Sequence, residues 1–230
     1  MKKVFSQFSL TLLVLIVAAC QPADTENKIA EDNVAAETSS EPVEVALDDD
    51  GMARAYFASG CFWCVEAVYE SVTGVDESIS GYAGGHTENP TYESSNTGTT
   101  GHAEAVEIIY DPKTVDFATL VDVYFGSQNV EQVNGQGPDN GSQYRSIIFY
   151  QNDEQKKIID GKIAALNEEL GGNKIAAEVM PFEKFWVAED YHQDYEKLNP
   201  NNGYVRGVSV PRLHRFQEKF PDLLKEDAKH

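Results

Sequence analysis

Apolar residues recur with helical spacing directly after a short apolar strand pattern. From Val65 to Val72 they stand at i, i+3, i+4 and i+7, which predicts a helix over residues 61–72 with one buried face. Glu66 and Glu70 fall between these positions and are predicted to be directed elsewhere. Two further helices are predicted, residues 117–124 capped by Asp116 and residues 153–170 with Asn152 and Gln155 as a capping pair and Gly171-Gly172 as the stop.

Strands are predicted where short runs of β-branched, aromatic and small apolar residues lie between these helices. Their ranges are 53–58, 75–82, 103–110, 143–150 and 175–180. The C-terminal third is aromatic and polar, a long irregular segment with helical patches near 188–198 and 212–224. Because strands and helices alternate, the sequence predicts a layered α/β or α+β sandwich.

The N-terminus has the pattern of an export signal. Lys2 and Lys3 precede an apolar run from Leu10 to Ala19, which is too short to cross about 30 Å of hydrocarbon. Residues 1–19 are therefore predicted to be a signal peptide, and the Val17-Ala18-Ala19-Cys20 ending resembles the lipobox of bacterial lipoproteins, in which the Cys becomes the lipidated N-terminus. A plain secretory signal with an incidental Cys is the alternative. A signal peptide places the domain outside the cytoplasm, so we expect a cell-envelope protein on the extracytoplasmic side, in the periplasm or at the cell surface.

Composition separates a tether from a domain. Residues 21–50 hold ten acids, one Lys and no aromatic residue, so residues 20–50 are predicted to be an acidic, flexible tether and residues 51–230 the folded domain. The whole chain carries 18 Lys and Arg against 38 Asp and Glu, a formal net charge of −20. Such a surface repels phosphate backbones, which argues against nucleic acid as a partner.

The densest chemical pattern is the Cys61-Phe62-Trp63-Cys64 segment, at a step from strand to helix. Unpaired backbone N–H groups and the helix dipole stabilise a thiolate at a helix N-terminus, so Cys61 is predicted to be a nucleophile. A thiol three residues later can capture an oxidised Cys61. A structural disulfide and half of a metal site are the alternatives, but no further ligands are paired at metal spacing, and we predict neither metal nor cofactor.

A glycine-rich loop from Gly81 to Gly101 lacks the spacing of a phosphate-binding motif and leads into the strand that carries Glu104. Ala103, Ala105 and Val106 surround Glu104, and an apolar setting raises the pKa of a carboxyl group, so it could donate a proton. A solvent-facing strand Glu is the alternative. Spacing alone does not indicate which of the 11 tyrosines would be catalytic.

Six motifs in order resemble the peptide methionine sulfoxide reductase A family over residues 56 to about 204. They are Gly60-Cys61-Phe62-Trp63, Gly81-Tyr82-Ala83-Gly84-Gly85, Asn89-Pro90-Thr91-Tyr92, Gly101-His102-Ala103-Glu104-Ala105-Val106, Gln143-Tyr144-Arg145-Ser146 and Ala188-Glu189-Asp190-Tyr191-His192-Gln193. The resemblance implies a two-layer α+β fold with a central mixed sheet. It also implies reduction of the S epimer of methionine sulfoxide, free or in proteins.

The resemblance assigns roles to nine residues of the domain. Cys61 would be the nucleophile and Glu104 the proton donor, because a sulfoxide oxygen leaves poorly until it is protonated. The other assignments are Phe62 and Trp63 as the apolar wall, Tyr92 and Tyr144 as donors to the sulfoxide oxygen, Asp139 and Tyr204 as pocket residues, and Cys64 as the resolving thiol.

Cys64 takes the resolving role because many relatives have Gly there and resolve with a later Cys, whereas here Gly203-Tyr204-Val205 replaces the usual Gly-Tyr-Cys. A thioredoxin-like donor would then reduce the Cys61–Cys64 disulfide. Two other readings remain open from the residues, a general thiol-disulfide oxidoreductase and a solute-binding lipoprotein, of which the second does not require the thiols.

Overall fold

The computed structural model describes Leu47 and residues 51–229. The predicted signal peptide, Cys20 and nearly all of the predicted tether lie outside the described residues. In the described part of the chain, no helix has the length and apolar character needed to cross a membrane.

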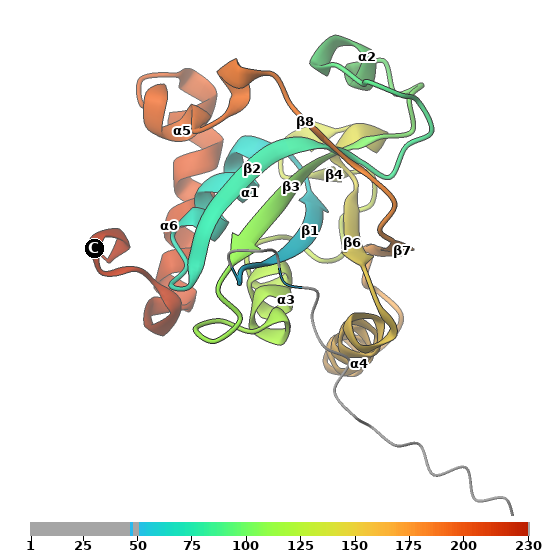
Figure 1. The fold of residues 1–230 in the computed structure, drawn as a ribbon, viewed down its shortest axis with the longest axis vertical. Coiled ribbons are helices and arrows are strands. Elements are labelled where there is room, and N and C mark those ends of the chain that lie inside the picture. Colours follow the sequence, from blue (N-terminus) through green and yellow to red (C-terminus); the bar gives the residue numbers. More distant parts are fainter. Residues whose placement is uncertain (1–46, 48–50, 230) are drawn as a thin grey trace, which may run out of the picture. The chain divides into compact units, whose positions relative to one another are not determined.

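Six strands form one mixed sheet (Figure 1). In spatial order they are β7 (Glu178–Pro181), β6 (Ser146–Tyr150), β1 (Ala53–Ser59), β3 (Ala103–Tyr110), β2 (Val75–Ala83) and β8 (Phe185–Val187). The β6–β7 pair is parallel and the other pairs are antiparallel. A separate small ribbon pairs β4 (Gly135–Gln136) with β5 (Asp139–Asn140).

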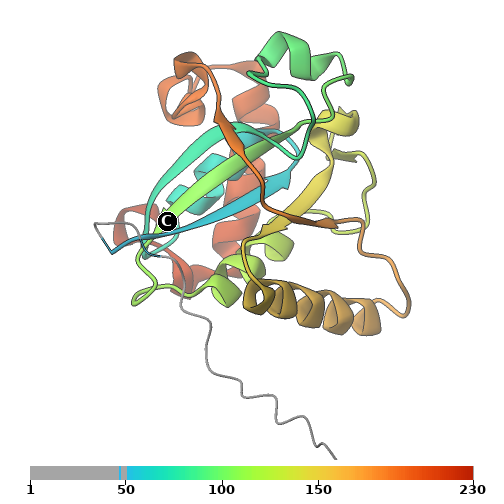
Figure 2. The ribbon, with the colours of Figure 1, turned by 45° about the vertical axis from the view of Figure 1, so that its right-hand side comes forward.

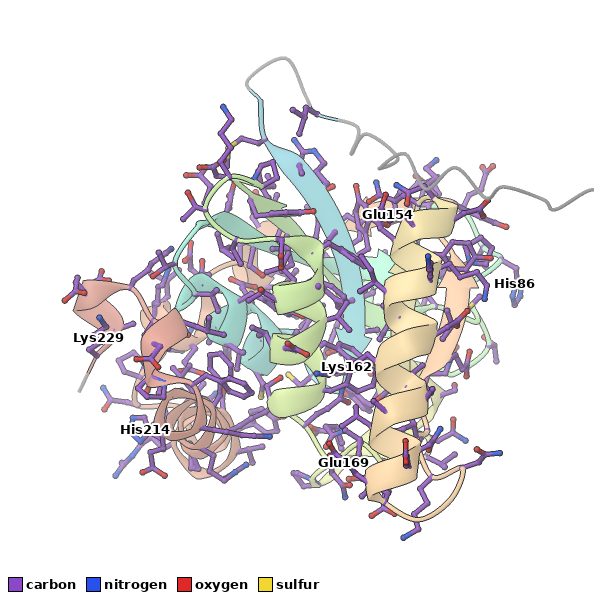
Figure 3. The ribbon with its side chains drawn as sticks, turned by 90° about the horizontal axis from the view of Figure 1, so that it is seen from below. His86, Glu154, Lys162, Glu169, His214 and Lys229 are labelled. Carbon is purple, nitrogen blue, oxygen red and sulfur yellow. The ribbon has the colours of Figure 1, made fainter. Side chains whose placement is uncertain are left out.

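The longer helices cover one face of this sheet. They are α1 (Phe62–Glu70), α3 (Phe117–Gly126), α4 (Asp153–Glu169) and α6 (Val210–Lys219). The alternation of each strand places one set of side chains in this layer, so Phe57 of β1 and Ile108 of β3 join Val65, Val68 and other α1 residues in the main core. α3 and α4 lie side by side, with an ion pair between Lys162 and Asp122 (Figure 3).

The opposite face carries small residues and is covered by the chain between β7 and β8. Ala58, Ala83, Ala103 and Ala105 leave room for this segment, which crosses the strands in Figure 2. Its Phe182 ring stacks on Tyr56 with centroids 3.7 Å apart. The two-layer α+β sandwich with a central mixed sheet is thus confirmed.

The predicted elements are found with shifted ends. Asp116 caps α3 through Thr119 N–H, and Asn152 caps α4 through Gln155 N–H. The predicted strand over 143–150 begins only at Ser146, because residues 142–144 form a helical turn. The sequence patterns did not predict α2 (Tyr92–Asn96), β8, or the extent of helix in the C-terminal segment, where α5 (Tyr195–Leu198), a π-helical turn (Val205–Ser209) and α6 follow one another.

Candidate active site

Cys61 stands at the step from β1 into α1. It occupies the N-cap position, and its carbonyl oxygen accepts the N–H of Val65 at 3.4 Å. Gly60 before it has a φ of +81°, a region that residues with a Cβ rarely adopt, and an added Cβ would lie 2.5 Å from Cβ of Gln136. The glycine therefore allows the sharp turn that places Cys61 at the N-cap of α1.

Glu104 of β3 lies directly beside this helix start. One of its carboxyl oxygens, Oε2, accepts the N–H of Phe62 at 3.0 Å, and the residue is 2% exposed. Burial raises the pKa of Glu104 to about 8, against the lowering effect of the Phe62 hydrogen bond. The structure therefore supports the predicted apolar setting, and the solvent-facing alternative is wrong.

The thiols of Cys61 and Cys64 are free and buried, and their pKa values are shifted in opposite directions. Burial, followed by the hydrogen bond with Cys64, raises the pKa of Cys61 well above its ordinary value. Desolvation therefore outweighs the stabilisation of a Cys61 thiolate by the helix N-terminus, and the role of Cys61 as nucleophile stays a prediction. The hydrogen bond from Cys61, with help from the charge of Arg212, lowers the pKa of Cys64 to about 6. These opposite pKa shifts favour a thiolate on Cys64 over one on Cys61.

Tyr92 and Tyr144 lie close enough to Cys61 and Glu104 to interact with them electrostatically. The Tyr144 hydroxyl donates to Asn96 Oδ1 at 3.4 Å, and the Tyr92 hydroxyl is hydrogen-bonded to both Asn96 and Tyr144. Burial raises the pKa of both phenols, and the nearby Glu104 and Cys61 raise it further. Both hydroxyls therefore keep their protons and can donate to an oxygen.

An aromatic cluster forms a wall next to Cys61. Phe62 is fully buried, with its ring centroid 6.2 Å from that of Trp63. Trp63 stacks on Tyr195 at 3.7 Å, and its Nε1–H donates to His192 Nδ1 at 3.0 Å. The indole is held in one orientation from both sides, so the wall is rigid.

Asp139 and Tyr204 reach the site at Cys64. The Tyr204 hydroxyl donates to Asp139 Oδ2 at 2.6 Å and lies 3.7 Å from Cys64 Sγ. The structure therefore brings all nine sequence-predicted residues of the domain together, in two groups. One group surrounds Cys61 and Glu104, and the other borders Cys64.

Comparison with known proteins agrees with this arrangement. The sequence model of the family described as peptide methionine sulfoxide reductase matches residues 53–224. The chain belongs to this family. Among curated relatives, MsrA of Pasteurella multocida is 46% identical over 172 residues, covering 75% of this chain and 98% of the relative. MsrA 1 of Rhodopirellula baltica is 44% identical over 190 residues, covering 83% and 98%.

Solved structures of the family share the fold. Methionine sulfoxide reductase A of Corynebacterium diphtheriae matches with a TM-score of 0.60 and 34% identity, covering 66% of this chain and 77% of the other. Reduced Mxr1 of Saccharomyces cerevisiae matches with a TM-score of 0.63 and 31% identity, covering 69% and 91%. The protein is therefore an enzyme that reduces methionine sulfoxide.

Three residues of the reductase site were not assigned a role from the sequence. Tyr195 and His192 orient Trp63, and the buried Arg212 of α6 places a positive charge near Cys64. His192 lies within a family motif, which was a usable signal. No local sequence pattern indicates Arg212, because its place in the site depends on contacts between α6 and Ser59 at the end of β1, which is distant in sequence.

One acidic cluster among the described residues has spacing compatible with a metal ion, formed by Glu66, Glu70 and Asp194. Nζ of Lys197 lies 2.8 Å from Glu70 and 2.9 Å from Asp194, so a cation of the protein already occupies it. Glu66 is 2% exposed and accepts hydrogen bonds from the Ser80 hydroxyl and Asp194 N–H. The prediction that Glu66 faces away from the buried side is wrong, because β2 and the chain before α5 enclose it.

Proposed function

We propose that this reductase acts on the S epimer of methionine sulfoxide, free or in proteins, with Cys61 as nucleophile, Glu104 as general acid and Cys64 as resolving thiol. The observation that carries the proposal is the Glu104 carboxyl group held by Phe62 N–H at 3.0 Å, directly next to Cys61. An acid and a thiol at one helix start are what attack at a sulfoxide sulfur needs.

Substrate binding follows from the two walls of the site. Phe62 and Trp63 offer apolar surface to the S-methyl group, and the protonated hydroxyls of Tyr92 and Tyr144 donate to the sulfoxide oxygen. Glu104 is protonated up to a pH of about 8 and gives its proton to the same oxygen. The oxygen is thereby neutralised while the sulfur becomes open to attack.

The first half-reaction starts from the Cys61 thiol and the Cys64 thiolate. Cys61 passes its proton to Cys64, to which it is already hydrogen-bonded, and its sulfur bonds to the sulfoxide sulfur. Glu104 protonates the oxygen, which transfers to Cys61 as the carbon-bearing sulfur leaves with an electron pair. Methionine and a Cys61 sulfenic acid are the products.

The second half-reaction closes the disulfide. Cys64 sulfur attacks the Cys61 sulfenic sulfur, the S–O bond breaks, and the Cys64 proton leaves with the hydroxyl as water. Over both steps the protons of Cys61 and Glu104 end in that water, and the two cysteines lose two electrons to the sulfoxide. A thioredoxin-like dithiol donor then returns the two electrons and restores both sulfurs.

The test uses pure epimers with dithiothreitol. The full chain should convert methionine S-sulfoxide to methionine and leave the R epimer unchanged. Insulin disulfides should be reduced only slowly in a parallel assay. Rapid insulin reduction without methionine formation would instead indicate a general thiol-disulfide oxidoreductase, and turnover of neither substrate would indicate a binding protein.

We also propose that residues 1–19 are a signal peptide and that Cys20 carries lipid, with residues 20–50 as an acidic tether to the domain at 51–230. Support comes from the sequence, in the apolar run of residues 10–19 and the Val17-Ala18-Ala19-Cys20 ending. The reductase would then act in the cell envelope, on the extracytoplasmic side. Cys20→Ser should move the protein from the membrane to the soluble fraction, and unchanged membrane association would contradict the proposal.

A further inference from the structure

A cavity of about 740 Å³ borders Cys64 on the side of α6. We call it the α6 cavity, and its lining comes from α6, residues 207–208, and residues 126–139, with Cys64 at the wall. The residues of the substrate wall, Phe62 and Trp63, do not line it, and neither does Cys61. The α6 cavity therefore approaches the cysteine pair from the side of the resolving sulfur, and of the residues assigned to the substrate pocket Asp139 alone lines it.

The α6 cavity is positively charged in a strongly acidic protein. Arg212, Arg215 and Lys219 stand at i, i+3 and i+7 and so share one face of α6, which turns towards the cavity. Of the described residues in the lining, Asp139 is the one carboxylate, and it accepts the Tyr204 hydroxyl at 2.6 Å. The lining thus carries three cations against one acid, whereas the whole chain has a net charge of −20.

Arg212 is the inner cation; its charge acts on Cys64 and on Asp139, but none of the groups that accept its hydrogen bonds is charged. Its guanidinium donates to the carbonyl oxygens of Ser127 at 2.8 Å and Ser59 at 2.9 Å, and to Ser59 Oγ at 3.0 Å. All three acceptors are uncharged, and the residue is 7% exposed. A fixed, desolvated cation beside Cys64 favours an anion in the cavity, while exposed Arg215 and Lys219 stand further along the helix.

We propose that the α6 cavity binds a low-molecular-weight thiol that bears carboxylates, and that this thiol reduces the Cys61–Cys64 disulfide by attack at Cys64. The inference rests on the proposed function, which supplies that disulfide. It adds a second class of reductant to the thioredoxin-like donor. A small thiol fits the geometry because Cys64 is only 2% exposed and lies at the wall of a concave space.

The chemistry is a pair of thiol-disulfide exchanges. The thiolate sulfur bonds to Cys64 Sγ, the Cys61–Cys64 bond breaks, and Cys61 leaves with the electron pair and takes up a proton from water. A second thiol molecule then attacks the sulfur of the first small thiol in the mixed disulfide, and Cys64 is released as a thiolate. Two thiols become one disulfide, and the two electrons they lose restore the enzyme.

The test compares an anionic and an uncharged thiol on the same oxidised enzyme. The full chain is treated with methionine sulfoxide, and the Cys61–Cys64 disulfide is quantified by alkylation and mass mapping, so that Cys20 is not counted. Reduction is then followed with mercaptosuccinate and with 2-mercaptoethanol, each rate being expressed per thiolate. The measured quantity is the ratio of the two rates.

In Arg215→Glu/Lys219→Glu this ratio should fall about tenfold, because charge reversal repels the dicarboxylate and not the uncharged thiol. The matched control is Lys113→Glu/Lys157→Glu, which makes the same charge change at exposed positions outside the cavity and should leave the ratio unchanged. An equal ratio in all three proteins overturns the proposal. The proposal is also overturned if Arg215→Glu/Lys219→Glu slows only the reduction of the disulfide by thioredoxin, a result that would make the surface a protein docking site.

Salt dependence of the unmodified enzyme gives a second test that needs no variant. Added NaCl should slow reduction of the disulfide by mercaptosuccinate more than reduction by 2-mercaptoethanol, because salt screens the cations of the cavity. An equal salt dependence of the two reduction rates would contradict the proposal. Failure of the disulfide to form with methionine sulfoxide would contradict the proposed function instead, so the two failures are distinguishable.

Discussion

At the scale of single residues, the raised pKa of Glu104 comes from its position between an apolar sheet and a helix start. Burial raises its pKa to about 8, while the Phe62 N–H holds its carboxyl group in place. The same burial raises the pKa of Cys61, so the resting site contains an acid and a thiol that are both protonated. The hydrogen bond from Cys61 and the charge of Arg212 lower the pKa of Cys64, which favours a thiolate there.

Glu104→Gln should slow methionine formation by about 10²-fold or more, the usual scale for losing a general acid. Gln retains an oxygen that accepts the Phe62 N–H, so the fold should persist. The measurement is the single-turnover rate, with circular dichroism as a check on folding and exposed Glu77→Gln as the matched control. A near-normal rate would return Glu104 to a structural role.

The same groups predict a bell-shaped pH dependence of the single-turnover rate. Glu104 must be protonated to act as an acid, so the rate should fall as the pH rises above about 8. Cys64 must be a thiolate to accept the Cys61 proton, so the rate should also fall below about 6. Glu104→Gln should lose the upper limb, and an unchanged upper limb in that variant would contradict the assignment.

At the scale of elements, the step from β1 into α1 sets the position of Cys61. Gly60→Ala places a Cβ at a φ of +81° and 2.5 Å from Gln136 Cβ, so it should lower the free energy of unfolding by about 1–3 kcal/mol and slow turnover. Gly161→Ala is the control, because that α4 position is open and should gain about 0.5–1 kcal/mol. Denaturant unfolding measures both. Equal effects would show that the turn tolerates a side chain.

α1 is joined to β2 and to the segment before α5 through Glu66. Burial raises the pKa of Glu66 to about 8 in the folded protein, well above its ordinary value, so the folded state holds the proton more tightly. This contribution to stability is complete below pH about 4.5, decreases as the pH rises, and is gone above about 8. Glu66→Gln should therefore flatten the loss of stability between pH 5 and 9, as measured by denaturant midpoints. A slope as steep as in the unmodified protein would exclude this role, and Glu77→Gln is again the control.

At the scale of the whole molecule, local patterns predicted most elements, whereas long-range packing decided the charges of the site. The periodicity of α1, the Asp116 cap and the strand over 103–110 were readable because they depend on neighbouring residues. The protonation of Cys61 was not, since it depends on burial by distant segments. β8, with 3 residues, and α2, with 5 residues, were not predicted because elements this short show too little periodicity.

The roles of the nine site residues came from resemblance, and the structure explains why spacing could not supply them. Tyr92 and Tyr144 are far apart in sequence, and in the folded protein their hydroxyls contact each other and Asn96. Arg212 meets Ser59 across 153 positions of the chain. Contacts at such separations leave no local pattern, so the cations of the α6 cavity become visible only in the folded protein.

The division of labour between the two thiols is tested most directly by single turnover without reductant. Cys64→Ser should still form about one methionine per enzyme, at a lower rate because the thiolate that accepts the Cys61 proton is missing. It should then accumulate a trappable sulfenic acid on Cys61, since no second thiol of the site can displace the hydroxyl. Cys61→Ser should form none. If Cys61→Ser forms methionine and Cys64→Ser does not, the assignment of the nucleophile is reversed, and if Cys64→Ser cycles normally with thioredoxin, Cys64 is not the resolving residue.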